Sequence, residues 1–320
     1  MSVADPPLVS VVLPVRNGER TIGDCLTSIL RADYPADRRE IVVVDNASTD
    51  RTAEIIRRYP VRYVNEARVG RSAARNRGIQ ESRGEIIAFI DADCVASTRW
   101  LRELTAGFKE NGVLGVAGEI LAFPPTTLAE RYYAIQRARP QASSVGKSRP
   151  YAVTANVAFR KETFERIGVF DHRFRSGQDV DFGWRFFDAG LKLAYRDRAV
   201  VFHRHRPSGW SLFKQYFYRA QGWALLAQKH GSAWSVRQEL AQYRKLVAAV
   251  RKLGRAVLRY HRYGKDRMEL YYPYFEVIRR LAIRLGALYG LVRPLPGPSA
   301  LPAPSAVQSR PANRRRPRKR

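Results

Sequence analysis

Cysteine is almost absent from this chain of 320 residues, which holds only Cys25 and Cys94. Two isolated thiols exclude a disulfide framework and a cysteine-rich metal cluster, and they are typical of a reducing compartment. Long apolar runs are also missing, since no stretch reaches the roughly 18 apolar residues that span a bilayer. The first eight residues lack the basic and apolar segments of a signal peptide. These absences predict a cytoplasmic protein.

Acidic residues are scarce relative to basic ones, with 29 Asp and Glu against 57 Lys and Arg and a formal net charge of +28. Such an excess predicts an anionic partner, which could be nucleic acid, an anionic membrane surface or a phosphate-bearing substrate. The hydrophobic fraction of 45% is ordinary for a globular chain. The length suits one large domain, alone or with an appendage.

The first part of the chain, residues 8–125, alternates buried β-rich runs with helical stretches. Strands are predicted at 9–14, 40–45, 61–64 and 85–91, and helices at 21–31, 52–58 and 72–82. Continuous Val and Ile runs separated by helices indicate a Rossmann-like α/β sheet covered on both faces. Pro14, Asp45 and Asp91 each end a predicted strand, and ligands of such sheets bind at the carboxyl ends of the strands.

The rest of the chain divides into three parts. Residues 126–210 read as mixed structure, with strands at 153–160, 193–195 and 199–203 and helices at 161–167 and 180–189. Residues 211–293 read as long helices rich in Arg, Lys and aromatic residues. In the helix predicted at 271–291, Tyr274, Ile278, Leu281, Leu285 and Leu288 recur on one face and Arg279, Arg280 and Arg284 on the other, which indicates an amphipathic helix with a basic face. Residues 294–320 are rich in Pro and Arg and predict disorder.

Asp91-Ala92-Asp93 lies just past a predicted buried strand. Two carboxylates at this spacing can converge on one hard cation, and Mg²⁺ or Mn²⁺ often completes its shell with substrate phosphates. Taken alone, the motif fits a solvated loop turn equally well. Its place at a strand end favours the metal site.

Two further features of the first part allow alternatives. Asp45 ends a Val-rich strand, where it could accept from a nucleobase imide N–H, while residues 48–50 fit a turn that caps the next helix. Arg75 could face a diphosphate, because guanidinium matches phosphate oxygens. A solvated helix face is the alternative, and it is the favoured interpretation for Arg71 and Arg77.

The run Gly177 to Arg185 carries the second strong signal. Asp179 stands at the tip of a loop, where it could act as a base, whereas Asp181 could be a simple partner of a helix start. His203 and His205 follow an apolar run. Either could be a metal ligand or a phosphate contact, and partly buried histidines of an aromatic region are an equally good interpretation.

Six segments share an order and spacing that are specific when taken together: residues 11–19, 41–50, 74–78, 91–93, 156–160 and 177–181. In these segments the chain resembles the family 2 glycosyltransferases, inverting enzymes with the GT-A fold. The resemblance covers about residues 8–210. It implies a GT-A nucleotide-sugar-binding domain with a mixed central sheet, whose donor-binding half is 8–125 and whose acceptor-binding half is 126–210. A helical, basic, amphipathic extension (211–293) and a disordered basic tail (294–320) would follow.

The resemblance also implies roles for individual residues. Asp179 would be the catalytic base. On the acceptor side we expect Asn156, whose strand resembles the one before the family's acceptor site, together with Gln178, Asp181 and Trp184. Gln178 departs from the Glu that the family often has. The resemblance gives Asp93 as a ligand of the metal, Mn²⁺ or Mg²⁺, and Asp91 as a contact of the donor ribose or the metal. His203, singled out above, is the expected third ligand. The donor-binding residues would be Pro14, Val15, Asn17, Glu19, Asp45, Arg75, Asp91 and Ala92.

The implied reaction moves a sugar from a nucleoside diphosphate sugar, with UDP favoured, to an acceptor hydroxyl. The acceptor would be a saccharide or a lipid-linked molecule of cell-surface polysaccharide or glycolipid synthesis. The basic helices and tail suit an anionic membrane, so we expect a peripheral location at its inner face. The alternative is a basic nucleic-acid- or membrane-binding protein with a non-catalytic GT-A-like domain. A specific nucleic-acid partner is not expected, because no nucleic-acid-binding motif is present. The sequence does not indicate the oligomeric state.

Overall fold

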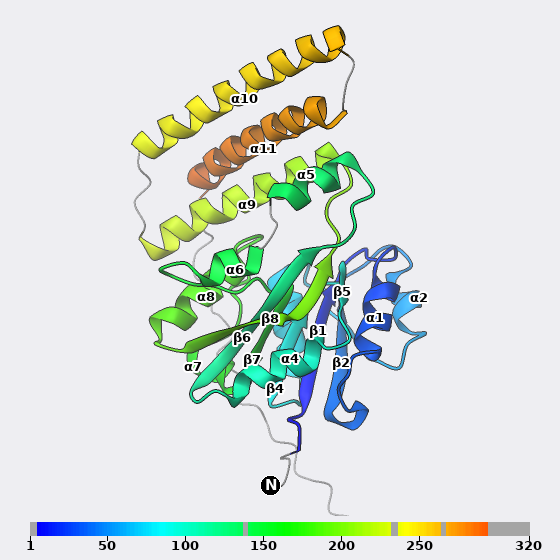
Figure 1. The fold of residues 1–320 in the computed structure, drawn as a ribbon. Helices are drawn as coiled ribbons and strands as arrows, with labels where there is room; N and C mark the ends of the chain where they lie inside the picture. The colour runs from blue at the N-terminus through cyan, green and yellow to red at the C-terminus, as the bar shows by residue number, and fades with distance from the viewer. Residues whose placement is uncertain (1–4, 137–139, 232–235, 264–266, 294–320) are drawn as a thin grey trace, which may run out of the picture.

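The computed structural model describes residues 5–136, 140–231, 236–263 and 267–293, so the predicted disordered tail lies outside the described residues. Its centre is an eight-stranded sheet with the strand order β3-β2-β1-β4-β7-β6-β8-β5 (Figure 1). The strands are β1 (Val9–Val15), β2 (Arg39–Asp45), β3 (Arg62–Asn65), β4 (Ile86–Ile90), β5 (Cys94–Ala96), β6 (Val113–Ala122), β7 (Asn156–Arg160) and β8 (Lys192–His203).

Strand directions make the sheet a mixed one. β1 is parallel to both β2 and β4, and β2 is parallel to β3. β7 runs antiparallel to β4 and β6, whereas β8 is parallel to β6 and antiparallel to β5. β6 and β8 therefore point the same way as β1, β2 and β4. The predicted mixed α/β fold is confirmed.

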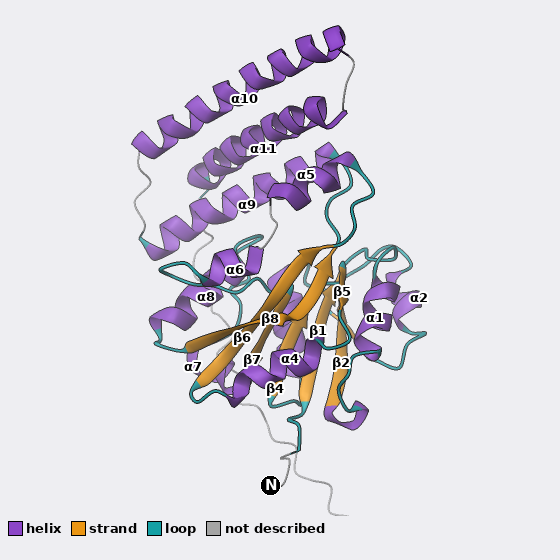
Figure 2. Ribbon diagram, in the orientation of Figure 1, coloured by secondary structure: helices purple, strands orange, loops and turns teal. Residues whose placement is uncertain are grey.

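Helices cover both faces of this sheet (Figure 2). Side chains of α1, α2 and α4 pack with one face of β1, and those of α3, α7 and α8 pack with the other face. The helices that precede Gly209 in the chain are α1 (Ile22–Leu30), α2 (Thr52–Ile56), α3 (Arg71–Glu81), α4 (Trp100–Ala106), α5 (Leu128–Gln136), α6 (Pro140–Val145), α7 (Glu162–Ile167) and α8 (Gln178–Asp188), with short 3-10 turns at Ala36–Arg38 and Gly107–Lys109. Of these, α5 packs with the later helices rather than with the sheet.

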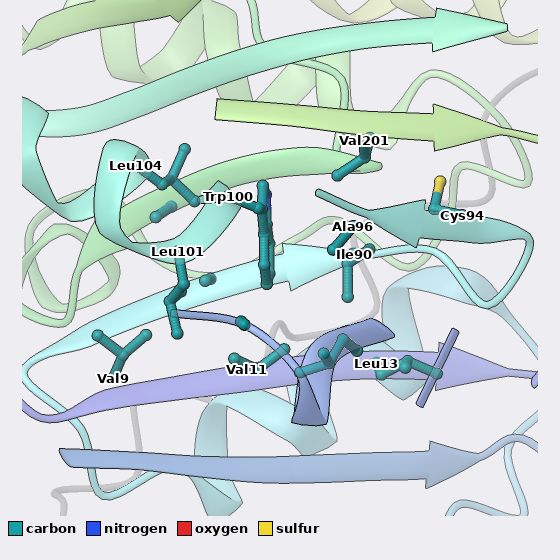
Figure 3. Close-up of a cluster of buried hydrophobic side chains, with 14 of the residues drawn as sticks. Val9, Val11, Leu13, Ile90, Cys94, Ala96, Trp100, Leu101, Leu104 and Val201 are labelled. Atoms are coloured by element: carbon teal, nitrogen blue, oxygen red, sulfur yellow. The ribbon is translucent and has the colours of Figure 1, made fainter. Parts of the chain in front are cut away.

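The larger core lies between β1 and α4 (Figure 3). Trp100, Leu101 and Leu104 are buried against the Val9 and Val11 side of β1. Full burial of one such aliphatic side chain contributes about 1.5–3 kcal/mol. This layer fixes the sheet from which the strand-end loops project.

Three long helices follow the sheet domain: α9 (Gly209–His230), α10 (Val236–Tyr263) and α11 (Arg267–Val292). Figure 1 shows them stacked beyond the edge to which the β6 and β8 arrows point, with α9 nearest the sheet and α10 outermost. α9 begins with a capping box between Ser208 and Ser211 and ends at Gly231 in the left-handed region. None of the described helices combines the length and the apolar content that a bilayer crossing needs.

The orientation of α11 differs from the usual packing of an amphipathic helix. The arginines of the predicted basic face point inward: Arg279 donates to Glu276 and to the Tyr132 hydroxyl, and Arg284 is buried. Four of the five apolar residues in the predicted pattern are exposed, namely Tyr274, Leu281, Leu285 and Leu288. Of the five, only Ile278 packs against the buried residues that α5, α9 and α11 share. The predicted basic face, which was expected to suit an anionic membrane, is therefore largely paired and covered.

Candidate active site

One edge of the sheet collects strand ends from both halves of the chain. β1 and β2 end together, with Val15 opposite Asp45, and β4 ends beside them at Ile90. β8 points the same way and ends at His203, while antiparallel β7 begins at this edge with Asn156 opposite Ile90. The predicted convergence of Pro14, Asp45 and Asp91 thus extends to residues of the second half.

Asp45 is buried at the end of β2, with only 3% of its surface exposed. One carboxylate oxygen accepts from the Tyr63 hydroxyl at 2.9 Å and the other from the Ser48 N–H at 3.0 Å. Burial and the hydrogen bond from the Tyr63 hydroxyl to the Asp45 carboxylate raise the pKa of Tyr63. Asp50 accepts from the Thr52 N–H at the start of α2, so the predicted turn coexists with the fixed Asp45 carboxylate.

Asn17 and Glu19 join two strand-end loops. Asn17 Oδ1 accepts from the Thr49 N–H at 2.8 Å, and Glu19 Oε2 accepts from the Arg51 N–H at 3.2 Å. Asn17 and Ala47 both have positive φ, 50° and 53°, a conformation that non-glycine residues rarely adopt. The Asn17 and Glu19 side chains therefore hold the loop after β1 against the loop after β2.

The apolar donor-side residues lie where β1 and β4 end. Val15 is buried, Pro14 is half-buried, and Ala92 packs on the larger core. Gly18, in the loop after β1, lies beside Ala92, because a Cβ built on Gly18 would overlap the Val15 side chain and come within 3.9 Å of the Ala92 Cβ. The loop after β1 and the loop after β4 are therefore adjacent.

Arg75 and Asp91 form an ion pair at this edge. Arg75 Nη2 donates to Asp91 Oδ1 at 2.8 Å, and Arg75 is buried on α3. Its Nε and Nη1 have no hydrogen-bond partner among the described residues. Burial alone would raise the pKa of Asp91, but the charges of Arg75, Arg71 and His203 lower it. Unpartnered buried guanidinium donors are costly, and an anionic ligand would satisfy them.

Asp93 and His203 come together because β5 pairs with β8, with Cys94 opposite His203. His203 Nε2 lies 3.4 Å from Asp93 Oδ1, and Arg206 approaches the other Asp93 oxygen at 3.5 Å. A carboxylate oxygen and an imidazole nitrogen are a fitting partial donor set for Mn²⁺ or Mg²⁺. Asp91, the third expected ligand, has one oxygen engaged by Arg75.

Cys94 and His205 are neighbours of this pair. Donor atoms of Asp93, Cys94 and His203 lie within 4.8 Å of one another. Burial, reinforced by the charges of Asp93 and Asp91, raises the pKa of the Cys94 thiol well above its usual value, so the thiol is protonated. His205 Nδ1 lies 3.3 Å from His203 Nδ1, and its ring packs on Tyr133. His203 is thus the histidine that reaches Asp93.

Several cations near these aspartates were not assigned from the sequence. Arg71 was expected on a solvated helix face, and it is exposed, yet its charge acts on Asp91. Its spacing from Arg75, one helical turn, was the available signal. Arg206 reaches Asp93 from the segment after β8, which no local motif indicates. Arg77, in contrast, pairs with Glu81 on the surface of α3 as expected of a solvated face.

Asp179 lies in the first turn of α8, directly after a tight turn. Gly177 caps the helix with φ 91°, and one Asp179 oxygen accepts from the Val180 N–H at 3.0 Å. Arg219 is a half-buried residue of α9. Although burial would lower the pKa of Arg219, interactions with Tyr133, Tyr216 and Asp179 raise it. Asp179 is therefore within electrostatic range of a cation on α9, a residue that the sequence analysis did not assign.

Asp181 lies on the inner side of α8 and is fully buried. It pairs with Lys229 at 2.6 Å, His230 at 2.9 Å and Arg185 at 3.1 Å. Lys229 also reaches Asp171 at 3.0 Å. Because these contacts join α8 to the end of α9, Asp181 holds the two helices together, and its expected place on the acceptor side stays a prediction.

The other expected acceptor-side residues are also packed inward. Asn156 is fully buried, and its Nδ2 donates to the Glu119 and Ala199 carbonyls at 2.7 Å each. Trp184 packs against Trp223 and His230 of α9. Gln178 is buried, and its Oε1 lacks a partner among the described residues. Asn156 thus connects neighbouring strands of the sheet, Trp184 lies in the interface between α8 and α9, and Gln178 directly precedes Asp179 in the chain.

The family model and the relatives that match this chain are described as glycosyltransferases. The family model described as Glycosyl transferase family 2 matches residues 10–168. The glycosyltransferase AglE of Haloferax volcanii is 36% identical over 218 residues, which cover 66% of this chain and 71% of that protein. The uncharacterized glycosyltransferase EpsJ of Bacillus subtilis is 28% identical over 216 residues, covering 63% and 62% of the two chains.

One solved structure resembles the fold of this chain over most of the length of both proteins. The mannosyltransferase PcManGT from Pyrobaculum calidifontis, solved in complex with GDP-Man and Mn²⁺, superposes with a TM-score of 0.62 and 22% identity, covering 89% of each chain. At this identity the likeness concerns the fold, including helices beyond the sheet domain.

Proposed function

This chain belongs to glycosyltransferase family 2, and we propose that it is an inverting, metal-dependent transferase that moves a sugar from a nucleoside diphosphate sugar to an acceptor hydroxyl. The observation that carries the proposal is the meeting of Asp45, the Arg75–Asp91 pair and the Asp93–His203 pair at one sheet edge. UDP is the favoured nucleotide.

The donor would occupy the strand-end loops. Asp45, held by Tyr63, would accept from the nucleobase imide, and the unpartnered Arg75 nitrogens would meet phosphate oxygens. Asp93 and His203, with Asp91 beside them, would hold Mn²⁺ or Mg²⁺. Such an ion supplies Lewis-acid stabilisation of the charge on the leaving diphosphate.

Asp179 would be the general base. One of its oxygens accepts from the Val180 N–H, and the other would take the acceptor hydroxyl proton as that oxygen attacks the anomeric carbon. The bond from the anomeric carbon to the diphosphate oxygen breaks as the new glycosidic bond forms, and the electron pair leaves with the nucleoside diphosphate. A single displacement inverts the configuration.

The acceptor would be a saccharide or a lipid-linked molecule in cell-surface polysaccharide or glycolipid synthesis. The charge of +28 supports a peripheral location at the inner face of an anionic membrane. A non-catalytic, basic binding protein with this fold is the competing candidate, and the experiments below separate the two.

The test combines a donor screen with two variants. UDP-, GDP- and dTDP-sugars with Mn²⁺ should differ in the melting temperature they produce, since a ligand at 100 times its Kd adds about 2.7 kcal/mol. Asp93→Ala should abolish the metal-dependent part of this shift. Asp179→Asn should lower transfer by about 10²–10⁴-fold while donor binding survives.

Asp197→Asn is the matched control, because Asp197 is an exposed carboxylate on β8 outside the site, and it should leave both readouts unchanged. Metal-independent donor binding by the wild type would refute the metal assignment. Near wild-type turnover of Asp179→Asn would refute the base assignment. Absence of binding and transfer with every donor would favour the non-catalytic candidate.

A further inference from the structure

One face of α11 is apolar from Tyr274 to Val292 and is not covered by the described remainder of the chain. Its members lie on one side of the helix at spacings of three to seven residues, and we name them the outer stripe: Tyr274, Leu281, Leu285, Leu288 and Val292. Val292 is 80% exposed, and the other four are 42–44% exposed. At 1.5 Å per residue the outer stripe is about 27 Å long. Contiguous apolar surface of this kind marks an interaction site.

The outer stripe exists because the opposite side of α11 is used for close packing. A Cβ on Gly286 would overlap the Phe217 backbone, and one on Gly290 would lie 2.9 Å from the Gln221 carbonyl oxygen. Small residues therefore let α11 approach the α9 backbone, as in tightly packed helix pairs. The large aliphatic side chains are left on the outside.

The neighbouring helix α10 adds positive charge. Residues 236–263 contain eight Lys and Arg and a single acid, Glu239. We name Arg244, Arg251 and Arg255 the basic face of α10; they line a surface hollow together with Tyr243, Val247 and Ala248. Exposed apolar residues adjoin them, including Leu258 at 72% exposure. A hollow of this composition suits a phosphate group attached to an apolar chain.

The charge of the whole chain is concentrated in this region. Residues 211–320 contain 24 of the 57 Lys and Arg but only 4 of the 29 Asp and Glu. Most of the net charge of +28 therefore belongs to the helices and the segment after them. Basic segments of this density are attracted to anionic lipid surfaces.

We infer that the outer stripe of α11 and the basic face of α10 together form the surface that docks on an anionic phospholipid bilayer. The stripe would enter the headgroup–acyl boundary, and the arginines would bind the lipid phosphates. A second copy of this chain fits less well, because two surfaces of like charge would meet. Nucleic acid fits less well, because it offers nothing to a 27 Å apolar stripe.

This inference deepens the proposed function and rests on it for one consequence. α9 lies between α11 and the sheet edge, with Arg219 of α9 in electrostatic range of Asp179. A bilayer on the outer stripe would therefore hold the candidate active site at a fixed distance from the lipid surface, which suits an acceptor linked to lipid.

Vesicle co-sedimentation of the full chain tests the docking surface. Vesicles of phosphatidylcholine mixed with phosphatidylglycerol should bind the wild type, and vesicles of phosphatidylcholine alone should bind it weakly. Leu285→Ser/Leu288→Ser and Arg251→Glu/Arg255→Glu should each weaken binding by about tenfold or more. Arg31→Glu/Lys109→Glu changes the net charge equally at exposed positions of the sheet domain and should stay within about twofold of wild type.

Transfer to a soluble acceptor should be unchanged in all three variants, which separates docking from catalysis. Wild-type vesicle binding by both helix variants would overturn the inference, as would equal losses in the charge-matched control. Concentration-dependent self-association that Leu285→Ser/Leu288→Ser abolishes would replace the bilayer with a second copy. Competition by duplex DNA with no effect of the leucine variant would replace it with nucleic acid. Intact docking without transfer would refute only the proposed function.

Discussion

Replacing Gly222 of α9 with alanine should lower turnover far more than it lowers the free energy of unfolding. A Cβ on Gly222 would overlap the Ser176 carbonyl oxygen, lie 2.8 Å from the Ser176 carbonyl carbon and lie 3.4 Å from the Gly177 nitrogen. An ordinary contact between carbon and a carbonyl oxygen is about 3.3–3.6 Å. In Gly222→Ala, α9 and the loop that leads to Asp179 must therefore move apart by about 1 Å.

The expected magnitudes follow from opposing effects. Overpacking a buried contact costs about 1–3 kcal/mol, while Ala in place of a helical Gly recovers about 0.5–1 kcal/mol. We expect a net loss of about 1–2 kcal/mol in the free energy of unfolding. A displacement of about 1 Å at a catalytic group can lower turnover by about 10²-fold. Turnover should thus fall far more than stability.

Urea unfolding and sugar transfer are measured on Gly222→Ala and on two controls. Gly254→Ala lies on α10, where a Cβ meets no atom within 4 Å, and should gain about 0.5–1 kcal/mol with unchanged turnover. Gly286→Ala would overlap the Phe217 backbone, away from the loop, and should lose stability with a smaller effect on turnover. If Gly222→Ala turned over within twofold of wild type, contact with α9 would not set the position of Asp179.

Two further predictions concern the buried charges between α8 and α9. Replacing Lys229 with Met removes the ammonium shared by Asp181 and Asp171, and urea unfolding should show a loss of about 3 kcal/mol, since breaking a buried pair costs about 3–5 kcal/mol and other cations remain. Burial raises the pKa of Asp171, but hydrogen bonds from Arg173 and Lys229 outweigh it and hold the pKa well below its usual value. Its stabilisation is therefore present above about pH 4 and lost as the pH falls, so the stability difference between wild type and Asp171→Asn should shrink below that pH.

The first half of the sheet could be predicted because its signals are local. Val and Ile runs identified the strands that became β1, β2 and β4, and the rule on strand ends placed Pro14, Asp45 and Asp91 at one edge. Asp93 is close to His203 through the pairing of β5 with β8, a long-range contact that sequence spacing does not express. His203 was expected as a ligand only because it follows an apolar run, and that signal applied equally to His205.

β6 escaped prediction because glycine weakens its pattern. The ten-residue strand Val113–Ala122 includes Gly115 and Gly118, which lower the β-propensity of the run. Gly118 is required there, because a Cβ would overlap the Ala199 carbonyl oxygen and lie 2.7 Å from Asn156 Oδ1. The packing that demands glycine thus removes the side chain that would have marked the strand.

For α11, the sequence pattern predicted the helix but not its orientation. The repeat of Leu281, Leu285 and Leu288 correctly indicated a helix, but a repeat does not say which face is buried. Packing against α9 is decided by Gly286 and Gly290, which allow backbone contact that leucine would prevent. An apolar face is normally assigned to the core by default, and here the close approach of two helices reverses that assignment.

α9 connects the two proposals of this structure. Its Gly222 backbone lies against Ser176, and its Lys229 pairs with Asp181, so it fixes the loop and helix that carry Asp179. Elsewhere along α9 the Phe217 backbone lies against α11. Backbone contacts without intervening side chains leave little room for one helix to slide on the next. The proposed base and the proposed lipid-docking stripe are therefore held by one helix, and an acceptor delivered from a bilayer would meet Asp179 at a height set by α9 and α11.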